Sequence, residues 1–258
     1  MNLQIKNKRF IVCGASGGFG YAVAKALLKE GAKIISIARS DKSLKEFEKN
    51  FSDAIQNIKG DLTEEKTLDE ILNVIGDNFL DGIFVNAGGP PPKSVEETKM
   101  KDWDQAYQLV FRWKVDLVKR LLPKFKEQQY GRIVFLESMS VKQPVENLVL
   151  STSLRLAVVG FAKTLAQETA QNGITANVLG PGYHDTQAMQ RLYKIRAEEQ
   201  GISVEKARNS FEKEVPVGKM GEAAELSSLA LWLLSPLSRY VTGQTFSVDG
   251  GKNKSIFG

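Results

Sequence analysis

Glycine residues at positions 14, 18 and 20 follow a short apolar run, 10–13, and precede a stretch rich in alanine and leucine. Glycine lets the backbone turn sharply and approach a ligand closely, and a helix that begins at such a turn directs free N–H groups at an anion. A buried strand that enters a glycine-rich turn and opens a helix is typical of a pyrophosphate-binding loop. We therefore predict that residues 14–20 bind the pyrophosphate of a dinucleotide.

The next predicted strand ends at Ala38, Arg39 and Ser40. Proteins that bind NAD place an acidic side chain near this point to hold the adenosine ribose, whereas an arginine accommodates the 2′-phosphate of NADP. A guanidinium can form two hydrogen bonds to a phosphate, which an acid would repel. NADP(H) is therefore the preferred cofactor, NAD(H) is the alternative, and a solvent-exposed Arg39 without a ligand is the third interpretation.

Short β-rich runs alternate with longer helical patterns along the whole chain. This alternation predicts an α/β fold with a doubly wound, seven-stranded parallel sheet of the Rossmann type, in a single domain spanning 1–258. Most of the runs are continuously apolar, as expected for strands covered on both faces. The predicted strands are 9–13, 33–38, 54–58, 82–86, 132–137, 174–179 and 245–248, and the predicted helices are 18–30, 41–50, 63–76, 102–128, 151–172, 186–213 and 221–234.

Two stretches between these elements stand out. A stiff loop, 88–92, has the sequence Gly-Gly-Pro-Pro-Pro, and a charged, helix-favouring segment, 183–215, follows Pro181 and Gly182. In an open α/β sheet, ligands bind beyond the carboxyl ends of the strands, which is where both stretches are predicted to lie. They are read either as a substrate wall and a substrate lid or as two surface loops.

The composition is that of an ordinary globular protein, with 42% hydrophobic and 25% charged residues and a formal net charge of +5. Both signs of charge are interspersed, which argues against a nucleic-acid partner. The single cysteine, Cys13, indicates a reducing compartment. The apolar run at the N-terminus is too short for a signal peptide, and no apolar stretch approaches the roughly 20 residues that span a bilayer, so no membrane partner and a cytoplasmic location are expected.

The glycine spacing Gly-x-x-x-Gly-x-Gly resembles that of the short-chain dehydrogenase/reductase family, and the likeness runs through nearly the whole chain. The general layout is most similar to bacterial 3-oxoacyl-carrier-protein reductases, with Cys13 in a position usually held by threonine and read as a packing change. The further motifs that carry the resemblance are Gly60-Asp61-Leu62-Thr63, Asn86-Ala87-Gly88, Pro181-Gly182 with Thr186, and Val248-Asp249-Gly250-Gly251.

The resemblance implies a set of cofactor-binding residues. Gly17 leaves the glycine loop without the second basic residue that members favouring NADP often carry there, which keeps NAD(H) as the alternative. The implied residues are Gly14, Ser16, Gly17, Gly18, Phe19, Gly20, Arg39, Ser40, Asp61, Leu62, Asn86, Ala87, Gly88, Arg155, Pro181, Gly182 and Thr186.

The catalytic set of the family is a serine, a tyrosine that exchanges a proton, a lysine four residues later, and an asparagine on the preceding helix. An alignment without gaps places Ser138 on the serine, Ser151 on the tyrosine, Arg155 on the lysine and Val110 on the asparagine. The resemblance therefore implies Ser138, Ser151 and Arg155 as the catalytic residues of a site in which three of four family residues are replaced.

These replacements change the chemistry. An aliphatic hydroxyl is a far weaker acid than a phenol, and an arginine does not lose its proton in a protein. Arg155 can still donate hydrogen bonds to ribose hydroxyls and place fixed positive charge beside a developing oxyanion, and one helical turn separates it from Ser151. Val110 continues an apolar helix stripe and is read as packing.

Other polar residues near this site are weaker candidates. Tyr183 and His184, the one histidine of the chain, follow Pro181-Gly182 and are read either as acid/base groups or as packing against the cofactor. Glu137 precedes Ser138, and strand alternation places the two side chains on opposite faces.

The preferred interpretation is an oxidoreductase that transfers a hydride between NADP(H) and a small carbonyl, alcohol or related substrate, with a non-standard catalytic site and no metal. The alternatives are a cofactor-binding pseudoenzyme or sensor, and non-redox chemistry on a β-keto-type substrate. A homotetramer or dimer is expected, because helices 102–128 and 151–172 carry apolar residues on more than one face, including Trp113, Val158, Phe161 and Leu165, and the resemblance implies subunit interfaces there.

Overall fold

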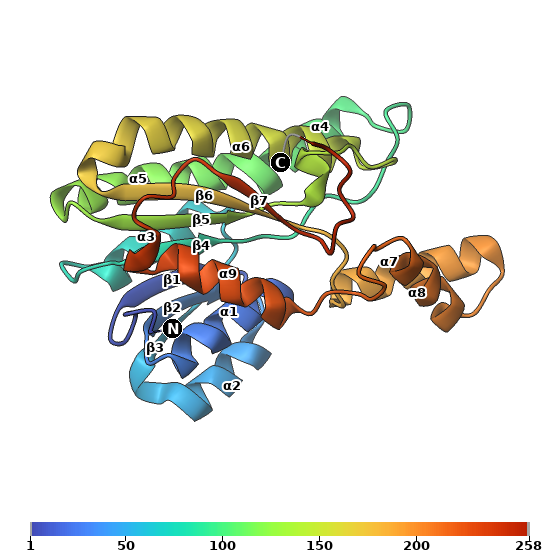
Figure 1. The fold of residues 1–258 in the computed structure, drawn as a ribbon. Helices are drawn as coiled ribbons and strands as arrows, with labels where there is room; N and C mark the ends of the chain where they lie inside the picture. The colour runs from blue at the N-terminus through green and yellow to red at the C-terminus, as the bar shows by residue number, and fades with distance from the viewer. Residues whose placement is uncertain (1, 257–258) are drawn as a thin grey trace.

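A single parallel sheet forms the centre of the molecule in the computed structural model, which describes residues 2–256. Its strand order, β3-β2-β1-β4-β5-β6-β7, confirms the predicted doubly wound Rossmann-type fold (Figure 1). The register places Phe10 of β1 beside Ile34 of β2 on one side and Gly82 of β4 on the other. The strands are β1 (Arg9–Cys13), β2 (Lys33–Ala38), β3 (Ile55–Lys59), β4 (Gly82–Val85), β5 (Gly131–Leu136), β6 (Ile174–Pro181) and β7 (Thr245–Val248).

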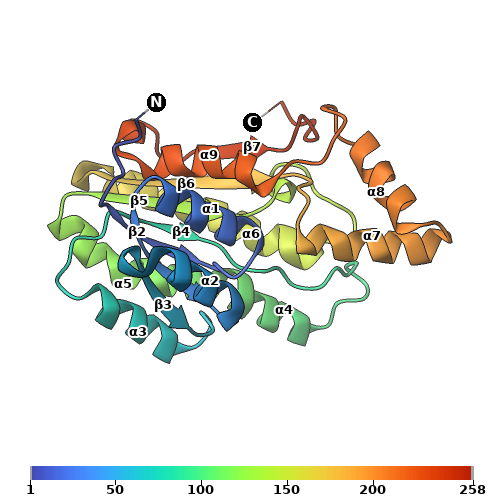
Figure 2. The ribbon, with the colours of Figure 1, turned by 90° about the horizontal axis from the view of Figure 1, so that it is seen from below.

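Helices cover both faces of the sheet, because alternate strand residues point to opposite sides and both sets are apolar. One face packs against α3 (Glu65–Ile75), α5 (Trp113–Glu127) and α6 (Val149–Thr169). The other packs against α1 (Gly18–Lys29), α2 (Asp41–Phe51) and α9 (Ala223–Leu234), as Figure 2 shows from below.

Two predicted helices are interrupted. The predicted helix 102–128 is α4 (Met100–Tyr107) and α5 joined by a π-helical turn, η2 (Gln108–Arg112). The predicted helix 186–213 is α7 (Gln187–Gln200) and α8 (Val204–Lys213). Gly201 ends α7 with a φ of +61°, and the Ser203 side chain caps α8 by accepting a hydrogen bond from the Lys206 N–H, so the chain turns between them.

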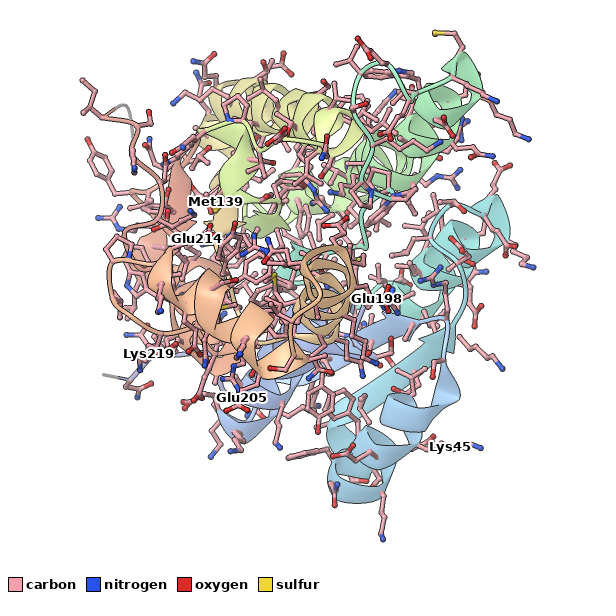
Figure 3. All side chains as sticks on the ribbon, turned by 90° about the vertical axis from the view of Figure 1, so that its right-hand side faces the viewer. Lys45, Met139, Glu198, Glu205, Glu214 and Lys219 are labelled. Carbon is pink, nitrogen blue, oxygen red and sulfur yellow. The ribbon has the colours of Figure 1, made fainter. Side chains whose placement is uncertain are left out.

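The pair α7–α8 extends beyond the sheet from the side where its strands end (Figures 1 and 2). Figure 3 looks onto this side and labels Glu198 on α7 and Glu205 on α8, which lie in front of the sheet. Any ligand at the strand ends therefore has the α7–α8 pair as one of its neighbours.

The apolar residues of α5 and α6 are distributed differently from the prediction. Trp113, Val158 and Leu165 do not lie on an outer face, since all three are buried in the core against the sheet. The exposed apolar side chain on α6 is Leu156, 50% exposed, and Phe161 is partly buried against Phe135 at 6.1 Å between ring centroids. Leu156 lies two positions before Val158, so the exposed apolar side chain is on the opposite side of α6 from the buried residues.

The helix predicted at 151–172 is more apolar over its length than the sequence analysis allowed. The helical segment Val149–Asn172 has the length and hydropathy of a membrane-spanning helix, so the expectation that no apolar stretch reaches this length is wrong. In the fold this segment packs on the sheet, with Val158 and Ala162 in the core.

Candidate active site

A cleft of about 420 Å³ lies across the carboxyl ends of the strands. The carboxyl ends of β1 to β6 and the loops that follow them supply most of its lining, and α1, α6 and α7 supply the rest, so the fold itself collects residues from distant parts of the sequence. The lining residues are Gly14, Ser16, Gly17, Gly18, Phe19, Ile37, Ala38, Arg39, Gly60, Asp61, Leu62, Asn86, Ala87, Gly88, Gly89, Leu136, Glu137, Arg155, Pro181, Thr186, Gln187 and Arg191.

The glycine loop has no room for side chains where it passes the end of β4. Gly14 has a φ of +67°, and a Cβ there would lie 2.8 Å from Asn86 Nδ2; a Cβ on Gly20 would collide with the Gly14 carbonyl. Asn86 Nδ2 also donates to the Cys13 carbonyl at 3.4 Å, which ties the ends of β1 and β4 together. Helix α1 begins at Gly18 beside the cleft, so its first N–H groups fit a pyrophosphate.

The adenosine end of the cleft carries Arg39 and Asp61. Arg39 is exposed at the rim. Asp61 accepts hydrogen bonds from the Thr63 N–H at 2.9 Å and the Thr63 hydroxyl at 2.8 Å. Burial acts to raise the pKa of Asp61, but these hydrogen bonds and the nearby Arg39 charge outweigh it and hold that pKa below its usual range. Asp61 is therefore ionised near neutral pH.

The other end of the cleft holds a buried polar network on α6. Arg155 Nε donates to Ser151 Oγ at 3.0 Å, and Arg155 Nη1 donates to Glu137 Oε2 at 3.0 Å and to the Glu137 carbonyl at 3.2 Å. The second carboxylate oxygen of Glu137 accepts from Lys114 Nζ at 2.5 Å. Glu137 thus bridges two cations, one on α5 and one on α6.

Lys114 is a functional candidate that the sequence analysis missed, and Glu137 is one that it named only as a weaker candidate. Glu137 continues the strand face of Ile133 and Phe135, which packs against α5 and α6, so its side chain meets Arg155 there. The expectation that Glu137 and Ser138 face opposite ways led us to set Glu137 aside, although Arg155 lies on the Glu137 side. Lys114 follows Val110 by four residues, and this spacing places both residues on one helix face. Since Val110 aligns with the family asparagine, the spacing could have pointed to Lys114 as a site residue.

Ser138 is less closely tied to this network. Its Oγ accepts a hydrogen bond from the Ser140 N–H at 3.1 Å, where the short 3₁₀ turn η3 (Met139–Val141) begins after β5. Within residues 2–256, none of the observed hydrogen bonds joins Ser138 to Ser151 or Arg155. Ser138 is therefore at the predicted strand end but outside the network.

Val110 lies in the π-helical turn η2 and is fully buried, as its reading as packing requires. Trp113 closes this turn by donating its indole N–H to the Leu109 carbonyl at 2.8 Å. π-turns within α-helices are often found at functional sites, because the extra residue shifts the helix face that follows. Here the turn directly precedes Lys114.

Tyr183 and His184 line a separate cavity of about 220 Å³ and are not among the residues that line the cleft. His184 as a whole residue is 3% exposed, its Nδ1 lies 3.2 Å from the Gly182 carbonyl oxygen, and its ring packs edge-on against Phe19 with 5.0 Å between ring centroids. Burial lowers the pKa of His184. These contacts describe a neutral ring packed at the base of α7.

The remaining predicted residues divide between the cleft and its supports. Cys13 is buried beneath the glycine loop, and burial raises the pKa of its thiol to about 12. In the described part of the chain, no group of three or more His, Cys, Asp or Glu side chains is placed to hold a metal ion. The predicted residues that do not line the cleft are Gly20, Ser40, Ser138, Ser151 and Gly182, and the lining residues not predicted are Ile37, Ala38, Gly60, Gly89, Leu136, Glu137, Gln187 and Arg191.

Known proteins match this chain over nearly its whole length. A family model described as enoyl-(acyl carrier protein) reductase matches residues 14–253. Dehydrogenase/reductase SDR family member 6 of Rattus norvegicus is 30% identical over 249 residues, which cover 96% of this chain and 98% of that protein. The 3-oxoacyl-acyl-carrier-protein reductase of Vibrio cholerae serotype O1 is 27% identical over 251 residues, with the same coverage of 96% and 98%.

A solved structure has the same fold. L-sorbose reductase from Gluconobacter frateurii, complexed with NADPH and L-sorbose, matches with a TM-score of 0.93. The two sequences are 24% identical, and the match covers 99% of this chain and 100% of that chain.

Proposed function

This chain belongs to the short-chain dehydrogenase/reductase family, and from that membership we propose that it is an NADP(H)-dependent oxidoreductase acting on a small carbonyl or alcohol. One observation carries the proposal: a single cleft joins the glycine loop and Arg39 at one end to Arg155 at the other. A dinucleotide lying along it would have its pyrophosphate at α1 and its reactive ring near Arg155.

The residues present fit such a cofactor. The absence of side chains at Gly14 and Gly20 leaves the backbone open to a pyrophosphate, and Arg39, exposed with no acid at position 38, suits a 2′-phosphate. Asn86, Pro181 and Thr186 line the same cleft further along. The bound nicotinamide supplies or accepts the hydride, while the protein supplies orientation and electrostatics.

In this proposal Arg155 replaces the family lysine and Ser151 the family tyrosine. The guanidinium of Arg155 supplies positive charge, and its contacts to Ser151 and Glu137 fix its position before a substrate arrives. A preorganised donor of this kind stabilises negative charge as it develops on a carbonyl oxygen. The substrate is therefore one whose oxygen needs charge stabilisation more than a built-in proton donor.

We further propose that 183–215 acts as a substrate lid. Gln187 and Arg191 of α7 line the cleft, and the Gln187 side-chain oxygen lies 4.0 Å from where a Cβ of Gly17 would be. The start of α7 therefore lies beside the glycine loop at the edge of the cleft, where a movement of the helix pair would cover a bound ligand.

A cofactor-binding sensor is the second candidate, because the described lining of the cleft includes no Tyr, Lys or His to transfer a proton. Fluorescence titration with NADPH, followed by NADPH consumption with a panel of small ketones and aldehydes, separates the two. Binding with consumption supports the enzyme, and binding without consumption of any panel member supports the sensor. Failure to bind either NADPH or NADH would overturn both.

We also propose that the protein is located in the cytoplasm and assembles as a homo-oligomer. The location is inferred from the single buried cysteine, which suits a reducing compartment. The assembly is inferred from the exposed apolar side chains on α4 and α6, Tyr107 and Leu156.

A further inference from the structure

The network at the floor of the cleft holds one more positive charge than negative charge. The side chains of Lys114, Glu137 and Arg155 are 1%, 0% and 10% exposed, and the single carboxylate is shared by both cations. Cys13, the remaining titratable group near Lys114 on β1, is a neutral thiol near neutral pH because burial raises its pKa. A buried charge without a partner is costly, so this surplus calls for an anion.

The effects of its neighbours on the pKa of Lys114 are consistent with this excess of positive charge. Burial lowers the pKa of Lys114, Glu137 opposes that shift, and Arg155 adds to it. The titratable groups that face Lys114 are thus Glu137 at the end of β5, Arg155 on α6 and Cys13 on β1. An anion bound beside Arg155 would favour the protonated lysine and relieve the repulsion between the two cations.

One nitrogen of the Arg155 guanidinium, Nη2, is available to bind a ligand in the cleft. Arg155 Nε and Nη1 are engaged by Ser151 and Glu137, whereas Nη2 donates to none of the described residues. A Cβ on Gly89 would lie 3.1 Å from this Nη2 and 3.9 Å from Ser151 Oγ, so the glycine keeps the approach open. Ser151 Oγ accepts from Arg155, which leaves its hydroxyl hydrogen available to the same ligand.

We propose that Arg155, held by Glu137 and Lys114, forms a binding subsite for a carboxylate carried by the substrate. The inference rests on the proposed function and narrows it to short oxo acids or the corresponding hydroxy acids. A neutral ketone compensates the buried charge only while its oxygen is becoming negative, whereas a carboxylate compensates it throughout binding. Arg155 contacts the ligand, and Glu137 and Lys114 are positioning residues that act through it.

A matched pair of ligands tests the subsite without turnover. Acetoacetate and its methyl ester have the same ketone and differ in charge, and neither can be reduced by protein saturated with NADP⁺. Isothermal titration of this complex should show acetoacetate binding at least about tenfold more tightly than the ester, as expected for a charge-assisted hydrogen bond. Equal affinities, or tighter binding of the ester, would overturn the subsite.

Three variants separate charge from packing. Lys114→Met brings the net charge of the buried network to zero and should abolish the preference for acetoacetate over its ester. Glu137→Gln raises that net charge and should keep at least the preference of the parent protein. The double variant Lys114→Met/Glu137→Gln returns the charge to +1 and should restore the preference, since Arg155 keeps Ser151 and the residue-137 carbonyl as acceptors. Lys119→Met, on the exposed side of α5, is the matched control and should change nothing.

A purely structural role predicts another result, in which all three variants lose the preference together. That outcome would overturn the proposal. If Lys114→Met does not fold, the double variant still tests the proposal. Its ratio of affinities for acetoacetate and for the ester is expected to equal that of the parent protein. A retained preference for acetoacetate in a protein that consumes no NADPH would support the subsite while rejecting the proposed reaction, so the two failures are distinguishable.

Discussion

Arg39 lies exposed at the rim of the cleft, next to Ala38 and close enough to Asp61 to influence its charge. We expect the protein to bind NADPH more tightly than NADH because this guanidinium pairs with the 2′-phosphate. Arg39→Ala should remove most of the difference, roughly 1.5–3 kcal/mol for a hydrogen bond to a charged group. Fluorescence titration of parent and variant with both cofactors measures it, and equal affinities in the parent would reject the NADP(H) assignment.

Ser151, Arg155 and Ser138 should contribute unequally to turnover. Ser151→Ala should reduce kcat/KM by less than about tenfold, since an aliphatic hydroxyl supplies no general acid. Arg155→Ala should weaken cofactor binding and cost on the order of 100-fold or more, the scale for losing a preorganised donor. Ser138→Ala should fall between the two or match Arg155→Ala.

The same kinetic series has a pH control. A rise in activity above pH 8 of the kind caused by a phenol should be absent, because Ser151 stands in the place of the family tyrosine and the described lining of the cleft includes no tyrosine. Loss of activity in Ser151→Ala with full activity in Arg155→Ala would contradict this assignment of roles.

Site residues could be predicted where the sequence immediately around them identifies their position in the fold. The glycine loop, Arg39 and Asn86 are recognisable because each directly follows an apolar strand, and the ends of parallel strands meet at one edge of the sheet. The Lys114–Glu137 pair joins residues 23 positions apart in the sequence, and it depends on which face of β5 packs against α5. Without that packing, a lysine in a helix and a glutamate before a serine look like surface residues.

At the scale of elements, the base of the α7–α8 pair should respond to acid through His184. Burial lowers the pKa of this ring from its ordinary 6.5, and the Gly182 carbonyl only partly opposes the shift. The unfolded chain therefore takes up the proton first as the pH falls, so stability is full above 6.5 and declines below it. Melting temperatures of parent and His184→Phe, compared across this range, should show a shallower decline in the variant. Parallel curves would contradict this linkage.

The spacing of apolar residues predicts whole helices and strands better than it predicts breaks within a helix. Strand and helix bounds agree closely with prediction where the pattern is simple, as in β1, β2 and β7. The π-turn at Gln108–Arg112 is invisible to periodicity because its residues remain apolar at helical spacing, while Trp113 stabilises the extra residue through the Leu109 carbonyl. Gly201 and Ser203 did carry a stop and a start signal for the break between α7 and α8.

For the whole molecule, we expect a homotetramer or dimer in solution. Leu156 is 50% exposed on α6, and Tyr107 is 41% exposed on the neighbouring α4, so the outer side of these helices offers apolar contacts. Leu156→Glu should shift the sedimentation coefficient at micromolar concentration to that of a smaller species. Val95→Glu, a matched change at a residue that is 68% exposed in a loop, should leave the assembly intact. A parent protein that sediments as a monomer would contradict the expectation.

The strand order of the sheet also has a consequence for synthesis on the ribosome. The β2 partner of β1 is synthesised soon after β1, but the partner of its other edge, Gly82–Val85, follows only after β3 and α3. During that interval the nascent chain presents an unpaired, strongly apolar strand edge at what becomes the middle of the finished sheet. Translation that pauses between Lys59 and Gly82 therefore leaves this edge open to pairing with another chain, and the arrival of β4 closes it.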